Sequence, residues 1–117
     1  MSYILATEVV KNDTIIFTED VYSGGYFNRV YVGKRVITAK VDKVIYNSDY
    51  ITYCMDVIKC SGVEANLILE QQRIRRRDYK IFNDVVLRQE WQNELNRCIL
   101  TDELYLYEMS NKKLIYA

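Results

Sequence analysis

The chain has 117 residues, and its 50% hydrophobic and 27% charged composition is typical of a soluble globular domain rather than a disordered or membrane protein. Sixteen basic residues offset sixteen acidic ones, so no net charge draws the whole chain to nucleic acid or to an anionic membrane. There is no histidine, which excludes His-dependent catalytic triads and His metal ligands. We predict a single domain, residues 1–117, that is not an enzyme and holds neither metal nor cofactor.

The N-terminus and the cysteines both favour a cytoplasmic protein. Residues 1–8 contain no basic residue and reach Glu8 before an apolar run long enough for a signal peptide. Cys54, Cys60 and Cys98 are an odd number without CxxC spacing. We therefore expect small buried thiols in a reducing compartment.

The N-terminal half is predicted to form β-strands, because it is rich in Tyr, Val and Ile and the chain contains no proline. Strands are expected over residues 3–10 and 14–17, joined around the turn-forming pair Asn12-Asp13. A reversal follows at Gly24-Gly25.

Three longer strands are expected next, in antiparallel succession, over residues 29–46, 51–60 and 65–75. Each of them shows apolar residues alternating with period two. Gly33 predicts a bulge or a turn in the first, and turns are expected at residues 47–49 and 61–62.

The hydrophobic period changes after residue 82. Asn83 is an eligible N-cap, and a stripe of apolar residues at helical spacing follows, which predicts a helix that holds Trp91 in the core. The stripe consists of Leu87, Trp91, Leu95, Cys98 and Ile99. Thr101-Asp102 is expected to end the helix, and residues 104–116 to form a terminal strand or hairpin, with a second helix as the alternative. The predicted fold class is α+β, an antiparallel β-sheet-rich N-terminal part packed with one or two C-terminal helices.

The densest charge in the chain is a group of four arginines, Arg73, Arg75, Arg76 and Arg77. Guanidinium groups bind phosphate and carboxylate through paired hydrogen bonds and stack on flat rings, so the group indicates an anionic, ring-bearing ligand. On a strand, Arg73, Arg75 and Arg77 would share one face and Arg76 would lie on the other. The alternative is a solvated strand end balanced by nearby acids, namely Asp78, Asp84, Glu90 and Glu94.

Aromatic and amide side chains follow the arginines. Phe82 is the candidate to stack on a base, and Gln92 and Asn93 are candidates to bind a base edge or a ribose. The eleven tyrosines offer a different function, a contact surface for a protein partner or for self-association.

Two segments, RRRDYKIF at residues 75–82 and RQEWQNEL at residues 88–95, resemble the phage Thoeris anti-defence proteins that sequester cyclic ADP-ribose isomers made by bacterial TIR-domain enzymes. The resemblance implies a non-catalytic sponge, an oligomer built from dimers that holds the signal nucleotide intact between subunits. It places the arginines on the phosphates, Phe82 on the base, and Gln92 or Asn93 at the base edge or ribose.

The leading hypothesis is therefore a phage-encoded nucleotide sponge in the cytoplasm of the infected bacterium. The alternative is a protein-interaction module that inhibits a host defence enzyme or serves as a minor phage structural protein. Sequence-independent nucleic-acid binding through the arginines comes third, because the net charge is zero.

Overall fold

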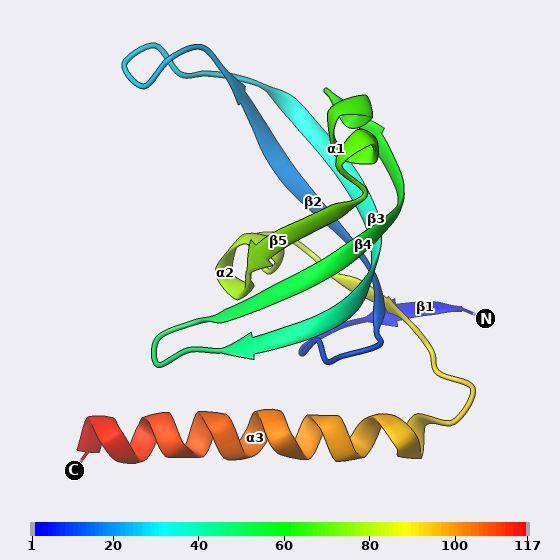
Figure 1. Ribbon diagram of the computed structural model, residues 1–117, viewed down its shortest axis with the longest axis vertical. Coiled ribbons are helices and arrows are strands. Elements are labelled where there is room, and N and C mark those ends of the chain that lie inside the picture. The colour runs from blue at the N-terminus through cyan, green and yellow to red at the C-terminus, as the bar shows by residue number, and fades with distance from the viewer. Residues whose placement is uncertain (1, 117) are drawn as a thin grey trace.

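A curved antiparallel sheet is the centre of the fold (Figure 1). The computed structural model describes residues 2–116, with side chains described for residues 2–110. The sheet has six strands in the order β1-β6-β2-β3-β4-β5. The strands are β1 (Tyr3–Leu5), β2 (Thr14–Ser23), β3 (Val30–Tyr46), β4 (Ile51–Gly62), β5 (Arg73–Arg77) and β6 (Leu87–Gln89), and the helices are α1 (Ala65–Gln71), α2 (Asp78–Ile81) and α3 (Glu94–Tyr116). This arrangement confirms the α+β class, with a sheet-rich N-terminal part and a C-terminal helix.

The long β2–β3–β4 meander confirms the central part of the sequence prediction. The strands expected over residues 29–46 and 51–60 correspond to β3 and β4, which pair antiparallel from Arg35–Gly62 to Tyr46–Ile51. The bulge expected at Gly33 is also confirmed, because the β2–β3 register shifts beside it and its φ is 141°. A Cβ atom at Gly33 would come within 2.7 Å of the Val63 side chain, so glycine is required there.

The sheet curls until β5 approaches β2, although these strands are not neighbours in it. Arg76 of β5 donates hydrogen bonds to Glu19 of β2, and α2 packs against β2, β4 and β5. The curled sheet encloses the core, whose largest fully buried side chains include Tyr53, Phe17, Ile15, Ile37 and Met55. Each such side chain contributes about 1.5–3 kcal/mol on burial.

Helix α3 lies along one side of the sheet (Figure 1). Leu104 is buried in the core, and the Tyr107 hydroxyl donates to the carbonyl of Asn47 in the β3–β4 turn. Near the start of the helix, Arg97 binds Asp13, which is fully buried. Side chains rather than close backbone packing therefore hold this helix.

The prediction of a strand over residues 65–75 is wrong for its first part. Residues Ala65–Gln71 form α1, between Glu64 with φ 53° and Gln72 with φ 61°. Of the residues in this helix only Ile68 is buried, whereas the alternating Leu67 and Leu69 are exposed. The leucines whose spacing suggested one side of a strand are therefore exposed to solvent. Strand pairing begins only at Arg73.

The helix predicted from Asn83 is wrong at both ends. Residues Leu87–Gln89 form β6, which pairs with both β1 and β2. The helix starts at Glu94 and continues through Thr101 and Asp102, since no glycine or proline follows to stop it. The terminal strand or hairpin is therefore wrong, and the helical alternative is confirmed as part of one continuous α3.

The strand expected over residues 3–10 is too long, because β1 ends at Leu5 and the fully buried Val9 and Val10 lie outside any strand. β2 in turn runs beyond the predicted residue 17 to Ser23. The cysteines are free, and Cys54 is buried and Cys60 half-buried. The expectation of buried thiols is wrong for Cys98, which is exposed on α3.

Candidate anion-binding cleft

Strand β5 distributes the four arginines to two faces, as the period-two geometry predicts. Arg73, Arg75 and Arg77 are exposed, while Ile74 is buried and Arg76 is half-buried on the opposite face. The four arginines therefore do not all serve one pocket within the chain.

Arg73 forms ion pairs on the outer surface of the sheet. It binds Asp42 of β3 at 2.8 Å and Asp56 of β4 at 3.3 Å. The hydrogen bond from Arg73 lowers the pKa of the Asp42 carboxyl below its usual range. Because both partners are exposed, these contacts contribute little to stability.

Arg76 belongs to a half-buried cluster with Glu19 and Arg35. The Glu19 carboxylate accepts from Arg76 Nε at 2.8 Å and from Arg35 Nε at 2.7 Å, so it joins β5, β2 and β3. Burial raises the pKa of Glu19, but the hydrogen bonds and charges of the two arginines outweigh burial and leave the pKa below its usual range. The acids that pair with the arginines of β5 are thus Asp42, Asp56 and Glu19. They are not the acids that follow the arginines in the sequence.

Arg75 and Arg77 have no carboxylate partner among the described residues. The Arg77 guanidinium lies 4.2 Å from the centre of the Tyr50 ring, a cation–π contact. Together with Thr52 and Arg76, these side chains line a shallow pocket of about 230 Å³ at the edge of the sheet. Its volume is below the usual range for ligand pockets.

A larger cleft of about 420 Å³ lies on the other side of β5, where the curled sheet brings α2 against β2. We call it the anion cleft. Four cations and two tyrosines line it together with two acids and one amide, and these are Arg29, Arg35, Arg76, Lys80, Tyr22, Tyr79, Glu19, Asp20 and Asn83.

Both acids of the anion cleft are already engaged. Glu19 is shared by Arg35 and Arg76, and Asp20 pairs with Lys34 at 3.0 Å. The other two cations of the cleft, Arg29 and Lys80, have no carboxylate partner within the described part of the chain. The cleft therefore combines two uncompensated positive charges with two phenol rings.

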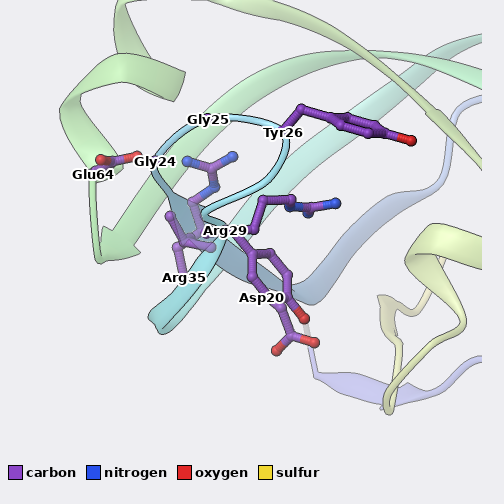
Figure 2. Close-up of a pocket in the computed structure, with 9 residues that line it drawn as sticks. Asp20, Gly24, Gly25, Tyr26, Arg29, Arg35 and Glu64 are labelled. Carbon is purple, nitrogen blue, oxygen red and sulfur yellow. The ribbon is translucent and has the colours of Figure 1, made fainter.

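The hollow continues under the Gly24-Gly25 turn at the tip of the β2–β3 hairpin. A neighbouring pocket of about 280 Å³ shares Asp20, Tyr22, Arg29 and Arg35 with the cleft. Figure 2 shows it, with Glu64 approaching from the segment before α1. The Arg29 guanidinium lies 4.4 Å from the centre of the Tyr22 ring, so this cation is positioned by stacking rather than by an acid.

Of the site residues predicted from the sequence, only Arg76 lines the anion cleft. Phe82 is partly buried and packs against the core at the end of α2. Gln92 and Asn93 line a separate pocket beyond β6, whereas Arg75 and Arg77 belong to the shallow edge pocket. Within one chain, the predicted set is not brought together.

Sequence reasoning missed Arg29, Lys80, Tyr22 and Tyr79. Two of them carried a signal, because Tyr79 and Lys80 directly follow the arginine group in the sequence. Tyr22 and Arg29 lie more than forty residues away, and only the curl of the sheet places them opposite Lys80.

No protein-family model, curated protein or solved structure matches the chain. None of the helices in the described part combines the length and apolar character needed to span a membrane. Within those same residues, no group of three or more Cys, Asp or Glu side chains could hold a metal ion.

Proposed function

We propose that the protein binds a small anionic molecule with a planar ring, of the nucleotide class, in the anion cleft and releases it unchanged. The observation that carries this proposal is the pair of uncompensated cations, Arg29 and Lys80, beside Tyr22 and Tyr79 in a cleft of about 420 Å³. That volume lies within the range of small-molecule sites.

The chemistry of the lining fits such a ligand. A phosphate between Arg29 and Lys80 gains charge-assisted hydrogen bonds, each contributing about 1.5–3 kcal/mol before desolvation is subtracted. A tyrosine face stacks on a base, which contributes roughly 1–3 kcal/mol. Glu19 holds Arg76 and Arg35 in place from behind, which leaves less side-chain freedom to lose on binding.

The specific ligand proposed is a cyclic ADP-ribose isomer, and the biological role is that of a phage-encoded sponge in the cytoplasm of the infected host. This part rests on the resemblance of residues 75–82 and 88–95. A homodimer or higher homo-oligomer belongs to the same proposal, because the resemblance implies an oligomer built from dimers.

Thermal-shift titration with cyclic ADP-ribose isomers, ADP-ribose and cyclic dinucleotides tests the proposal. A ligand at 100 times its dissociation constant should add about 2.7 kcal/mol of stability. Lys80→Ala should abolish the shift, since it removes an uncompensated cation without breaking an ion pair. Lys59→Ala, an exposed lysine of β4, is the matched control and should keep it.

Denaturing the complex and recovering the ligand separates a binding protein from an enzyme. Intact ligand supports sequestration, and altered ligand contradicts it. A shift that Lys80→Ala leaves unchanged would place the nucleotide elsewhere, with the edge pocket at Arg75 and Arg77 as the next site to mutate.

The protein-interaction alternative is favoured by the tip of the β2–β3 hairpin. Tyr26 and Phe27 are 88% and 91% exposed, and their rings form an edge-to-face pair. Aromatic residues exposed to this degree are typical anchors of protein interfaces. If no nucleotide shifts the melting temperature, this alternative becomes the leading one. Binding to any nucleic acid that weakens steeply with salt would instead support the third hypothesis.

A further inference from the structure

A second pocket, of about 390 Å³, lies where β6 leads into α3. We call it the amide pocket, because five of its lining residues carry carboxamides: Asn12, Gln89, Gln92, Asn93 and Asn96. It shares no lining residue with the anion cleft, whose lining comes mainly from β2, β3, β5 and α2.

Trp91 also lines the amide pocket, and hydrogen bonds hold both its indole and its backbone N–H. Its indole Nε1 donates to Asp13 Oδ1 at 2.8 Å, and its backbone N–H donates to Glu94 Oε2 at 3.0 Å. Asp13 is fully buried and is itself fixed by Arg97. The half-buried ring is therefore a fixed platform rather than the core side chain that helical spacing predicted.

Four of the five amide side chains around this ring are unengaged, and only Asn93 accepts a hydrogen bond, from the Leu95 N–H. The side chains of Asn12, Gln89, Gln92 and Asn96 make no hydrogen bond to any described residue. The lining has two charged residues, Lys40 and Glu90, whose charges cancel and which do not form an ion pair with each other. The pocket is thus neutral, rich in paired donors and acceptors, and built on one aromatic face.

We propose that the amide pocket binds the ring of an uncharged saccharide. A hydroxyl group is both donor and acceptor, which matches the NH₂ and C=O of a carboxamide. The C–H face of a sugar ring is apolar and suits the indole of Trp91. A phosphate is disfavoured, because Glu90 balances Lys40 and no arginine lines the pocket. This site is separate from the anion cleft and goes beyond the proposed function.

Trp91 is the only tryptophan in the chain, so its fluorescence reports on this pocket directly. The emission should change saturably on titration with at least one neutral sugar among ribose, glucose, galactose and N-acetylglucosamine. Ribose alone would identify the sugar of a nucleoside, and a hexose would identify a glycan. Glucose 6-phosphate should bind more weakly than glucose.

Variants of the amides complete the test. Gln92→Ala and Asn96→Ala should each weaken sugar binding about tenfold, equivalent to about 1.4 kcal/mol. Gln71→Ala removes an exposed amide on α1 and should bind as the parent protein does. All three should keep the parent melting temperature, because none of these amides has a partner to lose.

Three results would overturn the proposal. One is the absence of a fluorescence change with every sugar, and another is unchanged binding in both amide variants. The third is a fluorescence response to a nucleotide that Lys80→Ala abolishes, since both pockets would then hold one ligand. Failure of nucleotide binding at the anion cleft leaves a sugar response intact, so the two proposals fail separately.

Discussion

Glu19 shows how one residue positions several functional side chains. It is half-buried, and it is the only carboxylate to which Arg35 and Arg76 are bonded within the described residues. Without it, two guanidinium groups that are 15% and 21% exposed would face each other unpaired. Removing one partner of such a buried pair is costly, because an uncompensated charge remains.

Glu19→Gln should therefore destabilise the fold by about 2–3 kcal/mol, slightly below the usual range for a fully buried pair. Denaturant unfolding followed by circular dichroism measures this. Asp42→Asn, which removes the exposed partner of Arg73, is the control and should leave the midpoint unchanged. Equal effects of the two substitutions would mean that the Glu19 cluster does not hold β5 against β2.

Among the elements, α3 depends on a polar anchor at its first turns. Asp13 accepts hydrogen bonds from the Val10 N–H, the Trp91 indole and the Arg97 guanidinium, and its carboxylate is fully buried. Arg88 and Glu94 add a bidentate pair beside it. Since α3 contacts the sheet mainly through side chains, this anchor fixes where the helix begins.

Asp13→Ala should cost about 3 kcal/mol, because it leaves the buried Arg97 with only the partly exposed Glu8 as a charge partner and leaves two donors unsatisfied. Hydrogen exchange of the α3 amides should accelerate in parallel. Asp102→Ala, on the exposed side of the same helix, is the control and should change neither quantity. Normal protection of α3 in Asp13→Ala would show that Leu104 and Tyr107 suffice to dock it.

The elements that the sequence predicts well are those whose pattern is local. β3 and β4 alternate apolar and polar residues over long runs and end at recognisable turns, so their pairing follows. β6 spans only three residues and exists because β1 and β2 lie on either side of it, which no local pattern records. The cleft residues differ in the same way. Arg76 could be found from the sequence because it belongs to a local group of arginines, whereas Arg29 reaches the cleft only because the sheet curls.

At the scale of the whole molecule, the neutral net charge conceals an uneven distribution. Acids neutralise Arg73, Arg76 and Arg97 locally, whereas Arg29 and Lys80 remain uncompensated in one cleft. A small anion can therefore be attracted to the cleft without the long-range field that would gather nucleic acid. Ligand binding should accordingly depend on salt less steeply than nucleic-acid binding does.

The ionisable groups also predict how stability depends on pH. Because the chain has no histidine, no side chain with an ordinary pKa titrates between about pH 5 and 8, and stability should be nearly constant there. Several carboxyls have lowered pKa values in the folded protein. Hydrogen bonds cause this at Glu8, from Thr7, and at Glu94, from Arg88, and the pKa of Glu94 falls to about 2.

A carboxyl whose pKa is lower in the folded than in the unfolded protein stabilises the fold fully at pH values above its ordinary pKa. For Glu94 the ordinary pKa is 4.5, and its contribution is lost as the pH falls toward about 2. Urea midpoints measured from about pH 8 to about pH 2 should therefore stay level and then decline below about pH 4. Glu94→Gln should lower the midpoint at neutral pH and make the acid decline shallower, because a neutral amide has no proton to gain. A midpoint that rises on acidification, or that already falls between about pH 8 and 5, would contradict the assignment of these carboxylates to stabilising hydrogen bonds.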